Sequence, residues 1–295
     1  MRVVVAGSSG LIGTELVAVL RNRGDDVVRL VRRTAAGPDE AQWNPGTGHI
    51  ESNALVGVDA VVNLAGAGVG AHRWTAAYKR EIRASRTTAT HSIAAAISVL
   101  PAPPEVLVSA SAIGFYGDTG ERVVDENSPA GVGFLAEVVQ AWEAAAEPAH
   151  AAGIRVVHPR SGLVVSGKGG AWQRMFPLFK LGAGGKLGSG DQYWSFIAMA
   201  DEIAALLRLI DDDSLVGPIN LTAPQPATNA EVTRAMGEVL HRPTLLPVPS
   251  FALRAVLGEF SSEVLGSARV MPARLTEAGF QWQHPDIRSA IAAAL

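Results

Sequence analysis

The stretch that most constrains the fold is VVAGSSGLIG, residues 4–13, in which Gly7, Gly10 and Gly13 recur every third position. A strand-like run precedes the glycines, and apolar residues at helical spacing follow them up to Gly24. In such a turn the first glycine permits a sharp bend, the second admits a pyrophosphate and the third lets the helix pack closely on the strand. N–H groups at the helix start then face the anion. The pattern predicts a dinucleotide site formed by Gly7, Ser9, Gly10, Leu11, Ile12 and Gly13.

Short apolar runs rich in valine recur through the first half of the chain, which predicts further buried strands. Long helical stretches, Thr75–Val99 and Phe134–Ala152, lie between these runs. Alternation of strand and helix indicates right-handed crossovers and a parallel sheet that is covered on both faces. We therefore expect an α/β fold with a Rossmann-like, doubly wound parallel sheet over residues 1–165. Its predicted strands are Val3–Ala6, Val27–Val31, Asp59–Leu64, Glu105–Ser109 and Ile154–His158.

From about Ser166 the pattern changes to glycine-rich loops and short helices, with prolines clustered between Pro218 and Pro272. These features indicate a smaller, loop-rich C-terminal substrate lobe over residues 166–295. No low-complexity linker separates it from the first domain, so we expect some of its segments to pack back on the sheet.

Composition excludes several classes of function. Hydrophobic residues make up 48% of the chain against 18% charged residues, which is typical of a globular protein with a large core. The net charge of −3 and the scattered lysines and arginines argue against a nucleic-acid partner. The chain has no cysteine, and no histidine and carboxylate spacing suits a metal. No apolar run is long enough for a signal sequence or a membrane span, so the expected location is cytoplasmic.

Two arginines indicate which dinucleotide is bound. An acid at the end of the second strand would bind the ribose 2′-hydroxyl of NAD, whereas an arginine there accommodates the 2′-phosphate of NADP. This chain has Arg32 and Arg33 at that point, about 20 residues past the glycines, and no acid. The pair favours NADP as cofactor, although an ordinary solvated basic pair is the alternative.

Several motifs together resemble the extended short-chain dehydrogenase/reductase superfamily, the NAD-dependent epimerase/dehydratase fold. They are GSSGLIG, VVNLAG at residues 61–66, SASAIGFYG at 109–117 and GDQYWSFIAMADEIAALL at 190–207. The segments RWTAAYKREIRASRTTAT and PARLTEAGFQW resemble an atypical branch, sugar-nucleotide-epimerase-like, with a C-terminal domain of unknown function. The resemblance implies cofactor contacts from Leu64, Ala65, Gly66, Ser109 and Arg160.

The resemblance also exposes a gap in the expected catalytic machinery. The superfamily uses a Tyr-x-x-x-Lys pair on one helix face, and the corresponding positions here fall on Leu135 and Val139. Neither side chain can transfer a proton. Tyr116 and Ser111, which both lie in the SASAIGFYG motif, are predicted to replace the missing pair in proton transfer. For Tyr116 a purely structural role in a Tyr-Gly turn is the alternative.

Substrate contacts are predicted from Trp74, Arg86 and Trp194. Arg86 belongs to a helix whose basic residues recur at spacings of four and three, which suits an anionic substrate or an ordinary solvated face. For a tryptophan, a place in the core is the alternative, and buried tryptophans are more often core residues than ligand contacts. Two functions remain open: an NADP-dependent oxidoreductase or epimerase-like enzyme acting on a small molecule, and a catalytically silent NADP-binding sensor or interaction protein. A homodimer is possible by analogy with the superfamily.

Overall fold

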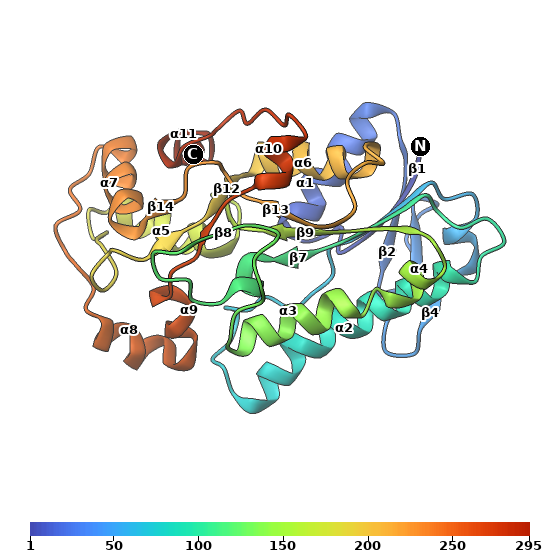
Figure 1. Cartoon of the computed structure of the whole chain (residues 1–295), viewed down its shortest axis with the longest axis horizontal. Coiled ribbons are helices and arrows are strands. Elements are labelled where there is room, and N and C mark those ends of the chain that lie inside the picture. Colours follow the sequence, from blue (N-terminus) through green and yellow to red (C-terminus); the bar gives the residue numbers. More distant parts are fainter.

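The computed structural model describes residues 1–295, and its centre is a nine-stranded sheet with the order β13-β9-β6-β5-β1-β2-β3-β4 (Figure 1). A short ninth strand, β7, pairs with β9 beyond the end of β6. Every pairing is parallel except that of β3 with β4. The predicted Rossmann-like parallel sheet is thus confirmed. The strands of this sheet are β1 (Arg2–Ala6), β2 (Asp26–Val31), β3 (Glu40–Asn44), β4 (His49–Ile50), β5 (Ala60–Asn63), β6 (Val106–Ser109), β7 (Ser111–Ala112), β9 (Arg155–Ser161) and β13 (Gly217–Leu221).

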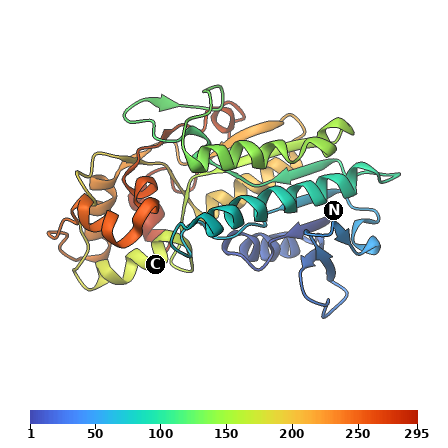
Figure 2. The same cartoon turned by 90° about the horizontal axis from the view of Figure 1, so that it is seen from below.

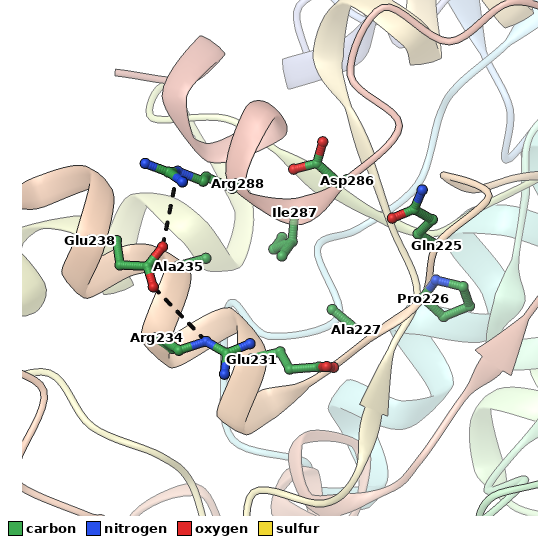
Figure 3. Close-up of a pocket in the computed structure, with 10 residues that line it drawn as sticks. All are labelled: Gln225, Pro226, Ala227, Glu231, Arg234, Ala235, Glu238, Asp286, Ile287 and Arg288. Atoms are coloured by element: carbon green, nitrogen blue, oxygen red, sulfur yellow. Dashed lines mark ion pairs between the residues drawn. The ribbon is translucent and has the colours of Figure 1, made fainter.

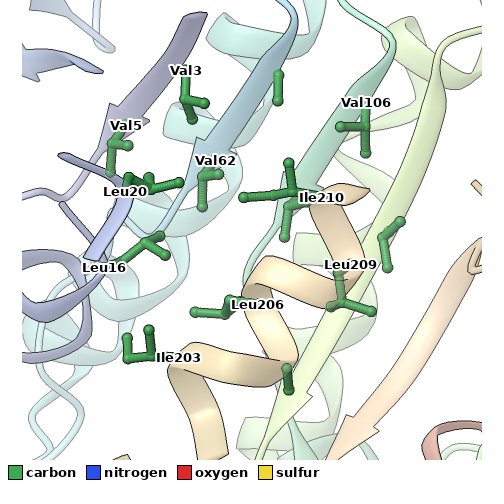
Figure 4. Packing of buried hydrophobic residues seen from close by; sticks show 14 of the residues in the cluster. Val3, Val5, Leu16, Leu20, Val62, Val106, Ile203, Leu206, Leu209 and Ile210 are labelled. Carbon is green, nitrogen blue, oxygen red and sulfur yellow. The ribbon is translucent and has the colours of Figure 1, made fainter. Parts of the chain in front are cut away.

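One face of the sheet is covered by α1 (Leu11–Arg23) and α6 (Met199–Asp211). Figure 4 shows Leu206 and Leu209 of α6 and Leu16 of α1 pointing toward the valines of the central strands. These three leucines are fully buried. Burying a leucine side chain contributes about 1.5–3 kcal/mol. The helix α1 ends at Gly24, whose φ of 92° lies in the left-handed region.

The opposite face is covered by α2 (Ala76–Ser98), α3 (Phe134–Ala144) and α4 (Glu147–Ala151). In Figure 2 the long α2 and α3 lie side by side across the sheet. Thr75 caps α2 by accepting the N–H of Tyr78 on its side-chain oxygen. The predicted single helix from Phe134 to Ala152 is two helices, because residues 145 and 146 interrupt the α-helical pattern.

Four strands of the sheet were not predicted: β3, β4, β13 and the two-residue β7. β3 and β4 lie at one edge, and β3 begins with the charged residue Glu40. β13 forms the other edge and begins with Gly217 and Pro218. Edge strands carry polar residues, glycine and proline more readily than central ones, so hydrophobic runs do not reveal them. Both α6 and β13 come from the 166–295 range, and both return to the sheet.

The remaining C-terminal segments form a lobe at the left of Figure 1. Its core contains Trp172, Phe176, Phe196 and Met236. No helix of the chain has both the length and the apolar composition needed to cross a membrane. The further helices are α5 (Gly170–Lys180), α7 (Asn229–Leu240), α8 (Ser250–Leu257), α9 (Ser261–Leu265), α10 (Ala273–Glu277) and α11 (Ile287–Ala293). The paired short strands are β10 (Leu163–Val165) with β12 (Phe196–Ala198), β11 (Tyr193–Trp194) with β14 (Ala227–Thr228), and β8 (Val123–Val124) with β15 (Arg269–Val270); the 3-10 turns are η1 (Ser52–Leu55), η2 (Ile113–Tyr116) and η3 (Gly258–Phe260).

Candidate dinucleotide and substrate site

The glycine-rich turn between β1 and α1 has no room for side chains at two positions. A Cβ at Gly13 would lie 2.2 Å from the carbonyl oxygen of Gly7, so the first turn of α1 packs directly on the turn backbone. Gly7 has a φ of 77°, and a Cβ there would lie 2.6 Å from the backbone of Leu64. Ser9 and Gly10 are exposed at the start of α1. The Gly10 N–H donates to the carbonyl of Gly7, and the N–H groups of the first residues of α1, from Leu11 to Gly13, have no partner within the helix and can bind an anion.

The two arginines after β2 have different surroundings. Arg33 donates two hydrogen bonds of 2.7 Å to the carboxylate of Glu40 on β3, and this pairing lowers the pKa of Glu40 to about 2. Arg29 also lies 2.8 Å from Glu40. Arg32 is exposed and makes no ion pair or side-chain hydrogen bond. Of the two predicted 2′-phosphate ligands, only Arg32 has its guanidinium free.

The ends of β5 and β6 are joined through one hydroxyl. Thr90 Oγ1 accepts from Asn63 Nδ2 at 2.9 Å and from Trp142 Nε1 at 3.0 Å, and lies 3.4 Å from Ser109 Oγ. The two N–H donors occupy both lone pairs of Thr90, so its proton is directed to Ser109. Asn63 also accepts the N–H of Ala65. These bonds fix the start of the turn that holds Leu64, Ala65 and Gly66, and they make Ser109 a buried structural partner.

A buried ion pair lies beside the next predicted hydroxyl. Ser111 Oγ donates to Glu143 Oε1 at 2.6 Å, and Arg160 binds the same carboxylate through Nε and Nη2, each at 2.8 Å. Burial alone would raise the pKa of Glu143, but the bonds and charge of Arg160 outweigh it and hold this pKa below its usual value. The Arg160 guanidinium also lies 3.4 Å from the ring centre of Phe115. Arg160 is therefore committed to protein groups on several sides.

The Tyr116 hydroxyl belongs to the same network. It donates to Asn220 Oδ1 at 2.8 Å and accepts from Arg160 Nη1 at 3.0 Å. The residue is 1% exposed, and burial raises the pKa of its phenol. Asn220 in turn donates from Nδ2 to the carbonyl of Met271. These bonds match the structural alternative for Tyr116, while its role as proton donor stays a prediction.

The helix α3 presents apolar side chains where the superfamily pattern would have the catalytic pair. A Cβ at Gly114 would lie 3.4 Å from Leu135 Cβ and 3.9 Å from Val139 Cγ2. Leu135 and Val139 thus face the η2 turn that follows β7. No tyrosine, lysine or histidine lies on α3, so this helix supplies no proton carrier at the turn.

Arg86 of α2 lies next to the Gly66 turn. A Cβ at Gly66 would lie 3.3 Å from Arg86 Cγ and Cζ, and the guanidinium carbon is 5.0 Å from the ring centre of Trp142. Its Nη1 donates to the carbonyl of Ile82 at 3.0 Å. It forms no ion pair, and burial lowers its pKa to about 10.

The two predicted substrate tryptophans are largely buried. Trp74 is 7% exposed, donates from Nε1 to the carbonyl of Val69 and packs against Phe134 and Phe260. Trp194 is 8% exposed and belongs to the core of the C-terminal lobe. Their surroundings are those of core residues, and substrate contact by either stays a prediction.

The sequence predicted no role for four polar residues that are wholly or partly buried: Glu143, His158, Glu202 and Asn220. Glu143 lies on α3, and its partner Arg160 lies on β9. Glu202 accepts from Ser161 Oγ at 2.6 Å and leaves Oε2 without a partner. His158 has a buried Nδ1 without a partner, and burial lowers its pKa. Asn220 lies on the unpredicted β13. The only sequence signal that could have pointed to Glu143 and Glu202 is the presence of a carboxylate within a largely apolar helix segment.

A hollow of about 460 Å³ lies elsewhere, on the C-terminal lobe, between α7, α11 and the segment before β14 (Figure 3). Glu238 lies 4.0 Å from both Arg234 and Arg288 there, so the local charges are paired. This hollow is not lined by the glycine-rich turn or by the network around Glu143 and Arg160. The candidate site is therefore placed at the turn and the network, not at the hollow. No group of three or more histidines and acids could hold a metal ion.

The parallel sheet, the glycine turn at its first crossover and the exposed α1 N-terminus define a Rossmann-type dinucleotide-binding protein. The sequence pattern of the NAD dependent epimerase/dehydratase family matches residues 3–221, and a domain of unknown function, DUF1731, matches residues 248–294. The chain belongs to the NAD dependent epimerase/dehydratase family, which confirms the resemblance found in the sequence.

Individual relatives match over nearly the whole chain. An epimerase family protein of Mycobacterium leprae is 48% identical over 99% of this chain and 95% of its own length. The crystal structure of human epimerase family protein SDR39U1 with NADPH has a TM-score of 0.91 and 33% identity, covering 99% of this chain and 98% of the human one. A nucleoside-diphosphate sugar epimerase from Corynebacterium glutamicum has a TM-score of 0.82 and 34% identity, covering all of this chain but 58% of its own.

Proposed function

We propose that this protein binds NADP(H) and acts as an oxidoreductase or epimerase-like enzyme on a small molecule, without a tyrosine and lysine pair. The observation that carries the proposal is the turn after β1, which has no room for side chains at Gly7 and Gly13, together with the unpaired Arg32 after the neighbouring strand β2. The human relative that was crystallised with NADPH supports the same cofactor.

The residues present fit NADP(H). The backbone N–H groups at the start of α1 would bind the pyrophosphate, and Arg32 would bind the 2′-phosphate. The segment from Leu64 to Gly66 would support the ribose. When bound, the cofactor supplies hydride chemistry. The chain itself contributes the Ser111 hydroxyl, which Glu143 holds as a donor, leaving the serine lone pairs to accept a hydrogen bond from a substrate hydroxyl.

A second candidate function is a catalytically silent NADP(H)-binding protein. One observation favours it: both predicted proton-handling hydroxyls are already bonded within the protein, Ser111 to Glu143 and Tyr116 to Asn220. An absent general acid typically costs 10² to 10⁴ in rate. Binding of the dinucleotide is common to both functions, and turnover separates them.

The cofactor assignment is tested by titrating NADPH and NADH into the wild type, Arg32→Gln and Arg33→Gln. We expect the wild type to prefer NADPH and Arg32→Gln to lose about tenfold or more in NADPH affinity, because charge-assisted bonds to phosphate contribute about 1.5–3 kcal/mol. NADH affinity should not change. Arg33→Gln is the matched control, since that guanidinium already binds Glu40. A wild type that prefers NADH, or an Arg32→Gln variant with unaltered NADPH affinity, would contradict the assignment.

The choice between the two functions is tested by turnover. Carbonyl compounds and nucleotide sugars are screened for loss of the NADPH absorbance band, followed by Ser111→Ala and Tyr116→Phe. An enzyme that uses these hydroxyls should lose activity in the variants while NADPH affinity is retained. NADPH binding without turnover of any substrate supports the silent protein.

A further inference from the structure

The side chain of Arg86 differs from the other cations at the start of α2. Lys79 forms an ion pair with Glu259, and Arg73 donates to the carbonyl of Ala255. Arg83 projects into solvent. Arg86 is half-buried, yet it has no carboxylate partner and uses only Nη1, for a bond to a carbonyl of its own helix. A half-buried cation without a counter-ion is costly unless another anion arrives.

The geometry around Arg86 holds the guanidinium in one orientation. The absence of a side chain at Gly66 lets it lie against the turn backbone, and Trp142 lies beneath it. The turn is itself tied to α2, because Ser85 Oγ accepts the N–H of Ala67 at 3.0 Å. Nε and Nη2 donate no hydrogen bond within the protein, and both keep contact with solvent. A fixed guanidinium with open N–H groups suits a phosphate or carboxylate.

We propose that Arg86, held between the Gly66 turn and Trp142, binds a phosphate or carboxylate group of a ligand at this edge of the sheet. The inference rests on the proposed function for the presence of a ligand here. The anion has two possible sources: the pyrophosphate of the dinucleotide, or a separate anionic substrate. In either case the guanidinium gains the counter-ion that the protein does not provide.

The test compares wild type, Arg86→Gln, Arg86→Lys and the control Arg83→Gln, which removes an exposed charge from the same helix. NADPH and NADH are titrated first, and then inorganic phosphate and malonate are titrated into bare and NADPH-loaded protein. Thermal unfolding verifies that each variant is folded. If the cofactor supplies the anion, Arg86→Gln lowers NADPH and NADH affinity alike, by about tenfold, since both carry the pyrophosphate.

If a separate substrate supplies the anion, cofactor affinity is unchanged in Arg86→Gln. The NADPH-loaded wild type then binds phosphate or malonate about tenfold more tightly than this variant. For whichever ligand shows the loss, the affinity of Arg86→Lys should lie between those of wild type and Arg86→Gln, because lysine keeps the charge but lacks the planar fork of the guanidinium. Equal affinities of wild type and Arg86→Gln in all of these titrations would overturn the inference. Failure of NADPH to bind the wild type would instead overturn the proposed function, and the titrations of bare protein would still decide the role of Arg86.

Discussion

Glu202 of α6 shows how a single buried carboxyl sets a pH dependence. Its side chain is wholly buried, its Oε2 lacks a partner, and burial raises its pKa to about 7 from an ordinary 4.5. The folded chain therefore holds this proton more tightly than the unfolded chain. The stability associated with Glu202 is complete below about pH 4.5 and is lost as the pH rises through 7.

We expect Glu202→Gln to remove this dependence. The free energy of unfolding of the variant, relative to wild type, should rise by roughly 3 kcal/mol between pH 4.5 and pH 8.5. Urea unfolding at several pH values measures it. The exposed Glu277→Gln is the control and should show no such trend. A relative stability that stays level across this range would contradict the assignment.

At the scale of elements, the unit β1–turn–α1 depends on the contact of Gly13 with Gly7. Gly13→Ala would force the backbone apart, since the new Cβ would lie 2.2 Å from a carbonyl oxygen. We expect a loss of about 1–3 kcal/mol in stability and at least a tenfold loss in NADPH affinity, because the α1 N-terminus moves away from the pyrophosphate. Thermal unfolding and NADPH titration measure the two effects.

Gly24→Ala is the matched control for that prediction. Gly24 ends the same helix at a φ of 92°, but a Cβ there would meet no atom within 4 Å. Its substitution should cost about 1 kcal/mol or somewhat more through backbone strain alone, and NADPH affinity should stay at the wild-type value. Equal loss of NADPH binding in both variants would show that global destabilisation, not the turn, is responsible.

The elements also show what could be predicted from the sequence. Central strands such as β1 and β5 are continuous apolar runs and were found within a residue or two, as was the turn at Gly7. The strand β3, next to the edge strand β4, was missed because it begins with the charged Glu40, and the edge strand β13 was missed because it begins with glycine and proline. The Glu143–Arg160 pair was missed because strand order, which brings α3 beside β9, is not encoded in any local spacing.

At the scale of the whole molecule, the two sequence ranges share the core on the α1 and α6 face of the sheet, although the C-terminal lobe also has a core of its own. The helix α6 and the strand β13 complete the sheet from beyond residue 165, β8 pairs with β15, and Tyr116 is bonded to Asn220. Removing residues 166–295 would uncover the α6 face of the sheet, with its many buried valines. The first 165 residues alone therefore lack half of their packing on one side.

We expect the full chain to unfold in one cooperative transition. Far-UV circular dichroism reports mainly on the sheet and its helices, while tryptophan fluorescence includes Trp172 in the C-terminal lobe. Coincident midpoints from the two probes would be the expected result. Two resolved transitions, with the lobe unfolding first, would contradict it. A chain that ends at residue 165 should lack a cooperative transition.

The Thr90 hydroxyl, which joins Asn63, Ser109 and Trp142, has a consequence for how far the sequence can vary. A hydroxyl has one proton and two lone pairs, and here all three are used. Valine has the same shape as threonine but would leave two N–H donors buried without an acceptor, at about 1–3 kcal/mol each. Among substitutions at this position, only serine keeps a hydroxyl with one proton to donate and two lone pairs to accept. Position 90, which touches no predicted ligand, should therefore be among the least variable of the chain.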